Sequence, residues 1–377
     1  MNIGVNIASM TPGASGGHEC YVRNIIRSLA DIDNTNKYVL VTGPMNYKTF
    51  ERPGPNWKVY LHEGSENTPL AYFYSDPNSL PTFDNNYLEN VRRLYGRVRG
   101  LVRSRTTSIW QGDLPRLVDE EQLDIWFCPL IYALPLDIDI PVVNTVPDLQ
   151  HEHYPELFNE DELRYRAAGY QYSCKAATST LAVSEATARD LAEIYDINAS
   201  KTFVTHLSID PSFCVGSDTL KQYTKKVKTK YGIHGDYIYY PANGWPHKNH
   251  AKLAEALHLC RKQGLDLALV LTGTPFGLMN RLKETLDRYG VQDCVRHLGY
   301  VNLEHLIGLY GGAKAMVFPS LFEGFGIPLL EAMALGTPIA CSNVTSLPEV
   351  GGDVPIYFDP KDAGSLADSI TRIARDE

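Results

Sequence analysis

Short apolar runs alternate with amphipathic stretches along most of the chain. Residues 3–7 form the first apolar run, and residues 22–29 then carry apolar side chains at helical spacing. The later runs that predict strands are 38–41, 125–128, 142–146, 181–183, 202–205, 237–240, 267–271, 295–298, 315–318, 338–341 and 356–358. Strands that alternate with helices are typical of βαβ units and mainly parallel sheets.

About a dozen strands are too many for one ordinary sheet, so we expect an α/β protein of two doubly wound domains. A chain of 377 residues also has room for two domains at roughly 150 residues each. Pro and Gly cluster after strand 202–205, which predicts domains 1–210 and 211–377. Residues 62–90 are rich in Asn, Pro, Ser and Asp, and we expect an insertion or lid there.

Composition narrows the function classes. The net charge of −9 argues against a general nucleic-acid binder. The seven cysteines are scattered and form no C-x-x-C pair, so neither a disulfide framework nor a structural zinc site is indicated. We find no run of ~20 apolar residues and no signal peptide, and therefore expect a cytoplasmic protein.

An arginine-rich stretch stands out at residues 92–105, with six arginines and no acid. Apolar residues recur beside the arginines at helical spacing, which is typical of a solvated helix face. The alternative is a surface that meets anionic lipid at the inner face of the cytoplasmic membrane, or a pyrophosphate-bearing acceptor. The sequence leaves both interpretations open.

The strongest motif is E-G-F-G-I-P-L-L-E at residues 323–331, in the segment that follows strand 315–318. Pro328 suits the first turn of a helix, which places Glu323 in the preceding loop and Glu331 in the early helix. Both acids then lie at the carboxyl edge of a parallel sheet, where doubly wound folds bind ligands. Helix-start N–H groups attract phosphate, and carboxylates accept hydrogen bonds from sugar hydroxyls. A capped helix with surface acids is the plainer alternative.

This motif, followed by A-M-A-L-G-T-P, resembles the E-x7-E motif of the retaining family-4 glycosyltransferases of the GT-B fold. The similarity is dense from about residue 237 onward and thinner before it. Further segments that match the family in order are 297–301, 318–320, 347–349 and 358–360. The resemblance implies two Rossmann-like domains facing each other across a cleft, with a nucleotide-sugar held by the later domain.

The resemblance also assigns roles to residues around the donor. It implies that Glu331 binds the nucleotide ribose and that Glu323 lies beside the donor sugar. Backbone N–H groups that would contact sugar or phosphate belong to Gly324, Phe325, Gly326 and Ile327. In the first domain, Gly16 and Gly17 precede a helix and would let backbone N–H groups approach the donor phosphate, since glycine has no Cβ to block it.

The loop at residues 240–250 resembles the family's loop that brings an arginine and a lysine to the diphosphate. Lys248 matches the lysine, but Asn243 stands at the arginine position. An amide donates a hydrogen bond without neutralising a leaving diphosphate, so the departure matters. Compensation by His247 or by a residue elsewhere stays open. The subgroup with this type of loop includes bacterial polysaccharide mannosyltransferases.

The segment after strand 142–146 reads T-V-P-D-L-Q-H-E-H. The family often has His-Asp here; Pro147 replaces the His, Asp148 remains, and His151 follows three residues later. We favour His151 over His153 for an acid/base or orienting role beside the sugar. The alternative is that neither histidine touches the sugar.

Taken together, the resemblance predicts a retaining hexosyltransferase that uses GDP-mannose and extends a bacterial surface polysaccharide of O-antigen or lipopolysaccharide type, on a lipid-linked glycan acceptor. UDP-sugars and dTDP-rhamnose stay open as donors. No cofactor or metal is expected beyond the donor itself. Lys248 would stabilise the leaving diphosphate, Glu323 would position the sugar, and the departing phosphate would serve as base in front-face attack.

Rival interpretations remain. A metal-dependent GT-A enzyme needs an Asp-x-Asp site, and the strings at 31–33 and 137–139 fit it only in letters. A sugar-nucleotide epimerase, a phosphorylase and a non-catalytic polysaccharide-binding scaffold are the others. The family's final helix crosses back to the first domain, and this chain stops within that region at residue 377. We therefore expect that helix to be missing, as in a truncated chain or one module of a longer enzyme.

Overall fold

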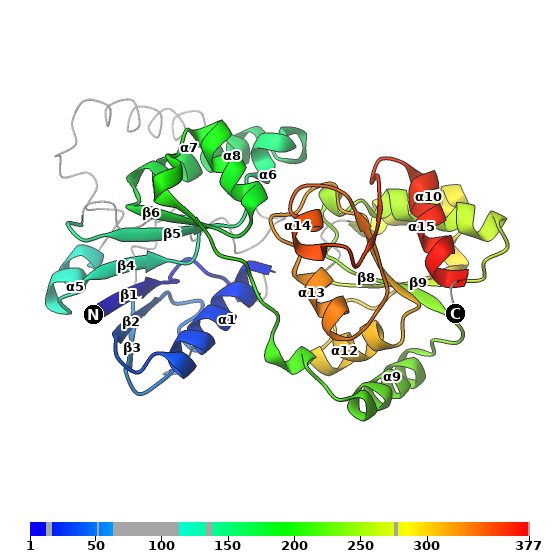
Figure 1. The fold of residues 1–377 in the computed structure, drawn as a ribbon, viewed down its shortest axis with the longest axis horizontal. Coiled ribbons are helices and arrows are strands. Elements are labelled where there is room, and N and C mark those ends of the chain that lie inside the picture. The colour runs from blue at the N-terminus through cyan, green and yellow to red at the C-terminus, as the bar shows by residue number, and fades with distance from the viewer. Residues whose placement is uncertain (13–16, 51–52, 63–112, 133–137, 275–277, 376–377) are drawn as a thin grey trace. The chain divides into compact units, whose positions relative to one another are not determined.

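The structure is a computed structural model, and it describes residues 1–377 except 13–16, 51–52, 63–112, 133–137, 275–277 and 376–377 (Figure 1). The described chain forms two compact units. The first contains residues 1–146, 168–181 and 197–203, and the second contains residues 147–167, 182–196 and 204–377. Gly16, most of the expected lid and the arginine-rich stretch 92–105 lie outside the described residues.

The first unit is built on a seven-stranded sheet with the order β3-β2-β1-β4-β5-β6-β7. Pairings are parallel between β1 and β2, β1 and β4, β2 and β3, and β4 and β5. The strands are β1 (Asn2–Asn6), β2 (Lys37–Thr42), β3 (Trp57–Leu61), β4 (Ile125–Cys128), β5 (Val142–Val146), β6 (Ser179–Ala182) and β7 (Thr202–Val204).

Side chains of this sheet alternate between two apolar layers, as the pleat requires. On β2, Leu40 packs in the layer that contains helix α1 (Gly17–Ile32). Its neighbour Val41 packs in the opposite layer, which contains helix α5 (Leu114–Glu120). Both faces are covered, which explains why β2 reads as a continuous apolar run.

The second unit holds a six-stranded sheet with the order β10-β9-β8-β11-β12-β13, and all five strand pairings are parallel. Its strands are β8 (Tyr237–Pro241), β9 (Ala268–Thr272), β10 (Val295–His297), β11 (Ala315–Phe318), β12 (Ile339–Ser342) and β13 (Ile356–Phe358). The strand order reverses between β8 and β11. That reversal is the topological switch point at which open α/β sheets bind ligands.

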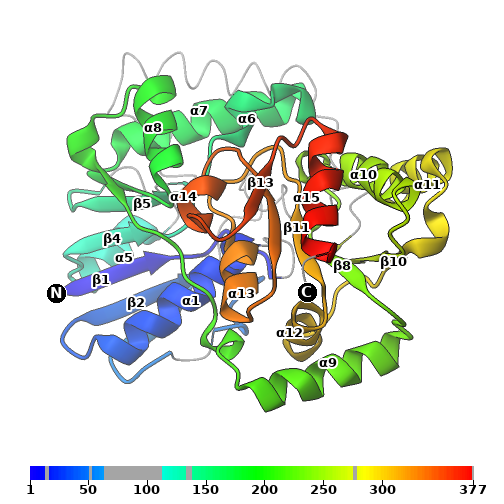
Figure 2. The same cartoon turned by 45° about the vertical axis from the view of Figure 1, so that its right-hand side comes forward.

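Helices cover both faces of this second sheet (Figures 1 and 2). Helix α10 packs against α11 and α15, while α9 packs against α12. The helices of this part of the chain are α9 (Ser217–Tyr231), α10 (His250–Lys262), α11 (Leu278–Tyr289), α12 (Leu303–Gly311), α13 (Ile327–Ala334), α14 (Leu347–Gly351) and α15 (Ala363–Arg375). Earlier helices are α6 (Gln150–His153), α7 (Glu160–Ala176) and α8 (Glu185–Tyr195).

The sequence predicts this architecture closely, with one strand missed. Strand β3 carries only five residues, W-K-V-Y-L, with an exposed lysine, and lies at the edge of its sheet. The lysine interrupts the apolar run in its second position, so the segment lacks the continuous apolar pattern by which the other strands are recognised. The predicted start of α13 is confirmed, since Pro328 lies in its first turn.

Candidate functional site

Two loops meet at the switch point of the second sheet. One follows β8 and spans residues 242–249, and the other follows β11 and spans residues 319–326. Because β8 and β11 are paired in parallel, both loops leave the carboxyl edge at neighbouring positions. The residues predicted to handle the donor sugar and its phosphates therefore come from adjacent strands.

Lys248 and Glu323 form an ion pair across these two loops. The distance from Lys248 Nζ to Glu323 Oε1 is 2.6 Å, and the two side chains are only 18% and 12% exposed. Lys248 Nζ also lies 5.8 Å from the centre of the Phe318 ring. A charge pair this poorly hydrated is sensitive to the loss of either partner, which leaves the other charge uncompensated.

The backbone around Lys248 is held by its neighbours. The buried Tyr240 hydroxyl donates to the carbonyl of Lys248 over 2.9 Å. Asn249 follows in the left-handed conformation, with φ 59°, and its side-chain amide donates to the carbonyls of Pro319 (3.0 Å) and Pro360 (2.8 Å). Three loops of the carboxyl edge are thereby tied together, so the Lys248 side chain starts from a fixed backbone position.

Asn243 takes part in a different link. Its Oδ1 accepts a 2.8 Å hydrogen bond from the backbone N–H of Thr274, and the N–H of Gly244 donates to the Thr274 carbonyl over 2.9 Å. The side chain thus braces the loop after β8 against the loop after β9. Its predicted contact with the donor diphosphate stays a prediction.

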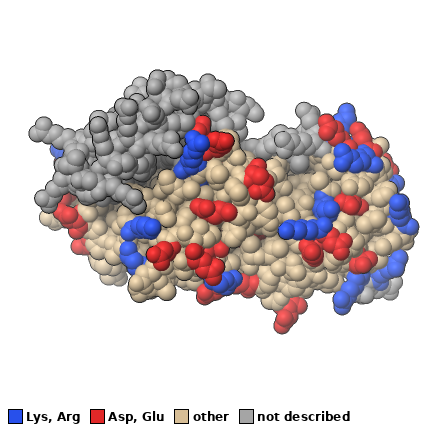
Figure 3. All heavy atoms as spheres, turned by 90° about the horizontal axis from the view of Figure 1, so that it is seen from above, with Lys and Arg blue, Asp and Glu red and all other residues tan. Residues whose placement is uncertain are grey.

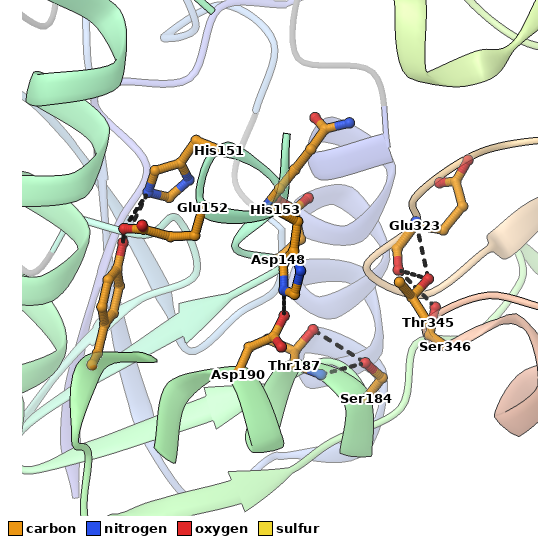
Figure 4. A network of polar contacts seen from close by, with 12 residues as sticks. Asp148, His151, Glu152, His153, Ser184, Thr187, Asp190, Glu323, Thr345 and Ser346 are labelled. Atoms are coloured by element: carbon orange, nitrogen blue, oxygen red, sulfur yellow. Dashed lines mark hydrogen bonds and ion pairs between the residues drawn. The ribbon is translucent and has the colours of Figure 1, made fainter. Parts of the chain in front are cut away.

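The loop that carries Glu323 is clamped by two hydroxyls that sequence reasoning missed (Figure 4). Thr345 Oγ1 accepts from the N–H of Glu323 (3.1 Å) and donates to its carbonyl (2.8 Å). Ser346 Oγ lies 3.0 Å from the Glu323 carbonyl and 2.9 Å from that of Phe325. Both residues follow β12 at the same sheet edge. Their position after a predicted strand is the one feature of the sequence that could have placed them at the site.

Two positions of this loop require glycine, Gly324 because of a close backbone contact and Gly326 because of its positive φ. A Cβ on Gly324 would collide with the carbonyl oxygen of Pro147, beside Asp148. Gly326 has φ 103° and caps helix α13, and a Cβ there would lie 2.7 Å from Leu347. Any side chain at either position would push the loop away from the site.

Glu331 is held apart from the ion pair, on helix α13. Its Oε2 accepts a 2.6 Å hydrogen bond from the hydroxyl of Tyr310 on α12. Burial raises the pKa of Glu331 to about 7, from 4.5, and the Tyr310 hydrogen bond only partly opposes this rise. A ligand that donates hydrogen bonds would favour the ionised carboxylate.

Two further histidines lie beside Lys248 and are neutral at physiological pH. Burial, and then the charge of Lys248, lower the pKa of His247 to about 2 and that of His250 to about 4. His247 also links the two loops, because its carbonyl accepts from the N–H of Leu321 over 2.8 Å. At neutral pH, the positive charge of this loop rests on Lys248.

His151, the histidine favoured by the sequence, is a buried side chain on the short helix α6. Its Nε2 lies 2.8 Å from the Tyr195 hydroxyl, which donates in turn to Glu152 over 2.9 Å. Burial lowers the pKa of His151 to about 4. Figure 4 shows the ring turned toward Glu152 and away from Glu323.

His153 is placed differently. Its Nε2 lies 2.8 Å from Asp190 Oδ2, and its ring centre lies 5.0 Å from that of Phe322, next to Glu323 in the chain. Its side chain is 37% exposed. Asp148, also predicted for the site, uses Oδ1 to accept from the N–H of Gln150. Of the two histidines, His153 is the one that contacts the Glu323 loop.

Glu349, in the L-P-E segment, has a role that the sequence did not reveal. Its carboxylate accepts from the N–H groups of Glu185 (2.8 Å) and Ala186 (3.3 Å) at the start of α8. It also lies 2.7 Å from Nε2 of His206, whose ring packs 5.8 Å from that of Phe325. An acidic side chain at a helix N-terminus is stabilising, so the Glu349 carboxylate links α14 to the start of α8. Ser184 caps the same helix, because its hydroxyl oxygen accepts from the N–H of Thr187 over 3.1 Å.

The described residues contain no group of three metal-ligating side chains that could hold an ion. Of the two Asp-x-Asp strings, Asp137 lies outside the described part, and Asp33 accepts hydrogen bonds from Thr35, Asn36 and Tyr38. These bonds hold the pKa of Asp33 well below its usual range. Gly17, the described member of the predicted glycine pair, begins helix α1.

The surface charge and the hydropathy of the helices complete the description of the structure. Across the described face in Figure 3, basic and acidic side chains are interspersed. None of the helices in the described ranges is long and apolar enough to cross a membrane.

Solved structures identify the class of fold. The chain is similar over its full length to Thermosynechococcus elongatus sucrose-phosphate synthase, with TM-score 0.71, 18% identity and 90% of that chain covered. Anabaena HepE in complex with UDP and glucose matches with TM-score 0.67, 18% identity and the same coverages. The lipopolysaccharide glycosyltransferase WaaG matches 99% of this chain and 92% of its own, with TM-score 0.65 and 14% identity. The fold is GT-B.

Sequence profiles identify the family. Residues 15–213, more than half of the chain, match Glycosyltransferase Family 4, and residues 225–377 match Glycosyl transferases group 1. The chain belongs to Glycosyltransferase Family 4.

Its curated relatives include mannosyltransferases. O-antigen chain mannosyltransferase B of Escherichia coli is 31% identical over 62% of this chain and 61% of its own length. O-antigen chain mannosyltransferase RfbU of Salmonella typhimurium is 28% identical over 61% and 60%. Serotype-specific mannosyltransferase WbdA of Escherichia coli is 31% identical over 53% of this chain and 25% of its own length. The chain thus spans less than two thirds of these relatives.

Proposed function

We propose that the protein transfers mannose from GDP-mannose, with retention of the anomeric configuration, to a growing bacterial surface polysaccharide of O-antigen type. The observation that carries this proposal is the Lys248–Glu323 ion pair, 2.6 Å long and poorly exposed, at the switch point of the second sheet. One member suits a diphosphate and the other suits sugar hydroxyls, so the pair matches the two halves of a nucleotide-sugar.

On donor binding, the Lys248–Glu323 ion pair would open, and each side chain would exchange its partner for a group of the donor. The diphosphate takes the ammonium group of Lys248, and the sugar hydroxyls take the carboxylate of Glu323. Backbone N–H groups of residues 324–327, at the start of α13, add hydrogen bonds to sugar or phosphate. As the bond to the anomeric carbon breaks, Lys248 stabilises the charge that develops on the leaving diphosphate.

Glu331 is our proposed ribose ligand. Two adjacent ribose hydroxyls donate to its carboxylate, and the Tyr310 hydrogen bond fixes its orientation. Because burial raises the pKa of this group to about 7, ribose binding would be accompanied by release of its proton near neutral pH.

For the histidine beside the sugar, the geometry favours His153 over His151. His153 contacts Phe322 and keeps an exposed edge, whereas His151 is buried against Tyr195. Asp190 orients the His153 ring through the 2.8 Å contact. We propose an orienting role for His153, and the departing phosphate as the base that takes the acceptor's proton.

The identity of the sugar and the acceptor rests on the relatives. Three of them are named mannosyltransferases, two of these for the O-antigen chain. UDP-glucose is the alternative donor, because HepE was solved with it. The arginine-rich stretch 92–105 is our proposed contact with an anionic membrane that would carry a lipid-linked acceptor.

A donor panel tests the proposal. Calorimetric titration with GDP-mannose, GDP, UDP-glucose, UDP, dTDP-rhamnose and ADP should give tightest binding for the two guanine compounds. Transfer from GDP-mannose to a methyl α-mannoside, followed by NMR, should give an α-linked product. Tighter binding of UDP-glucose or a β-linked product would contradict it. Tight binding with neither transfer nor donor hydrolysis would instead favour the scaffold interpretation.

A further inference from the structure

The side-chain amide of Gln150 is a buried hydrogen-bond donor that has no partner in the described part of the chain. Its Nε2 atom is shielded from water, and no acceptor among the described residues lies within hydrogen-bond distance. Buried polar groups of folded proteins are nearly always hydrogen-bonded, because an unsatisfied donor has lost its contact with water and gained nothing in return. The Gln150 amide is therefore suited to an acceptor that a ligand supplies.

The backbone on both sides of this amide is held in place. Gln150 begins helix α6, and its own N–H donates to Asp148 Oδ1 over 3.0 Å. Its carbonyl accepts from the N–H of Tyr154 over 2.9 Å. Leu149 and His151, on either side, are 0% and 1% exposed. The side chain of Gln150 thus extends from a fixed backbone position.

The segment that carries Gln150 packs on the loop after β11, and both belong to the second unit. After Gln150, the hydroxyl of Tyr154 donates to the carbonyl of Leu321 over 3.2 Å. Before it, Asp148 lies beside this loop (Figure 4), so that a Cβ on Gly324 would come within 3.0 Å of the Asp148 Cβ. Contacts on both sides of Gln150 therefore place it next to the loop that carries the proposed sugar ligand.

A sugar hydroxyl both donates and accepts hydrogen bonds. The ionised carboxylate of Glu323 only accepts, so it can satisfy the O–H group and leaves the lone pairs of the oxygen without a donor. The NH₂ group of Gln150 only donates and can supply that second half. It carries no charge, whereas the anionic diphosphate is matched by the ammonium group of Lys248.

We propose that Gln150 donates a hydrogen bond to a hydroxyl oxygen of the transferred hexose and so contributes to the choice of sugar. This inference rests on the proposed transferase function. It assigns Gln150 neither to the nucleotide nor to the breaking of the bond at the anomeric carbon. A site that pairs a hydroxyl with a buried donor rejects a sugar that lacks this hydroxyl, because the donor then stays unsatisfied.

The first experiment removes the donor and keeps the length of the side chain. Gln150→Met should leave the urea midpoint of the free protein equal or higher, since an unsatisfied polar group is removed. The calorimetric Kd for GDP-mannose should rise about tenfold, while the Kd for GDP, which lacks the sugar, stays unchanged. Gln150→Glu, with an oxygen in place of the NH₂ group, should show the same selective loss. Gln222→Met is the matched control, because Gln222 is exposed on α9.

The second experiment identifies the hydroxyl and distinguishes the donor sugar from the acceptor. GDP-mannose analogues that each lack one sugar hydroxyl are titrated into the parent and into Gln150→Met. One analogue should lose affinity for the parent and none for the variant, since both changes remove the same hydrogen bond. Donor hydrolysis, which needs no acceptor glycan, should show a lower kcat/KM in the variant. The KM for α-linked mannobiose methyl glycoside should stay unchanged.

Unchanged GDP-mannose affinity in Gln150→Met would overturn the proposal. Equal losses for GDP and GDP-mannose would place the contact on the nucleotide, and a raised glycoside KM with unchanged hydrolysis would place it on the acceptor; either result would overturn it. A lower urea midpoint in Gln150→Met would do the same, by showing that the amide has a partner within the folded chain. Failure of the parent protein to bind any nucleotide-sugar would instead reject the underlying transferase function.

Discussion

At the scale of single residues, the site is defined by charges that are shielded from water and paired with one another. Lys248 and Glu323 compensate each other at 2.6 Å, and Glu331 is stabilised by a tyrosine hydroxyl in place of a cation. Each of these arrangements is satisfied without ligand, and each offers groups that a nucleotide-sugar could take over. The contribution of these residues to protein stability can therefore be measured separately from their contribution to sugar transfer.

Lys248→Met and Glu323→Gln should each abolish transfer, with kcat falling at least ~100-fold, because transition-state charge loses its partner. Each single change also leaves one poorly exposed charge uncompensated and should lower the urea midpoint. The double variant removes both charges, so its midpoint should return toward that of the parent while activity stays absent. Equal midpoints in all four proteins would show that the pair is not energetically coupled.

Glu331→Gln should stabilise the protein at alkaline pH. The folded-state pKa, about 7, lies above the 4.5 of the free side chain, so the folded state holds the proton more tightly. Stability from this group is therefore present below pH 4.5 and is lost as pH rises through 7. The variant should gain up to about 3 kcal/mol at pH 8 and almost nothing at pH 4.5. Urea midpoints across this range check it, and a gain that is independent of pH would contradict it.

At the scale of elements, the site depends on loops that brace one another across the sheet edge. The loop after β11 is held by hydroxyls that follow β12, and the loop after β8 is held by partners that follow β9 and β11. The positions of Lys248 and Glu323 are thus set by contacts between segments that are distant in the sequence.

Ser346→Ala should loosen this bracing. The buried hydroxyl lies within hydrogen-bond distance of the carbonyls of Glu323 and Phe325, and its loss leaves them without that donor. We expect a loss of about 1–3 kcal/mol in stability and a larger relative fall in kcat than in donor affinity. The exposed Ser208, whose hydroxyl lies 3.4 Å from the neighbouring Ile209 carbonyl, provides the control Ser208→Ala. A fall in donor affinity alone would contradict a positioning role.

The difference between local features and contacts of distant segments explains what the sequence could predict. Hydrophobic periodicity predicts all but one of the strands, and a local rule predicts Pro328 in the first turn of α13, because both depend on neighbours in the chain. Thr345, Ser346 and Glu349 were missed because their partners lie from about twenty to more than a hundred residues away. His151 and His153 are two residues apart on a short helix and so point in different directions. The sequence alone does not show which of the two faces the Glu323 loop.

At the scale of the whole molecule, two doubly wound units give the GT-B fold, and the profile match over residues 15–213 places the chain in Glycosyltransferase Family 4. The first unit supplies a second carboxyl edge, and Gly17 begins its first helix. The division of the chain at about residue 210 stays a prediction, since the second unit also takes residues 147–167 and 182–196. Those earlier segments bring His153 and Asp148 into the unit that holds Glu323.

Ligand should stabilise this molecule by mass action. At a GDP-mannose concentration of 100 times Kd, the free energy of unfolding should rise by about 2.7 kcal/mol. Differential scanning calorimetry of the parent and of Lys248→Met would measure the effect, which should be lost in the variant. Equal shifts in both proteins would separate Lys248 from donor binding.

The most direct test is a crystal structure with GDP-mannose bound. We expect a diphosphate oxygen about 2.7–2.9 Å from Lys248 Nζ, a mannose hydroxyl on the Glu323 carboxylate, and the ribose on Glu331. A donor bound elsewhere, with the Lys248–Glu323 ion pair intact, would contradict it.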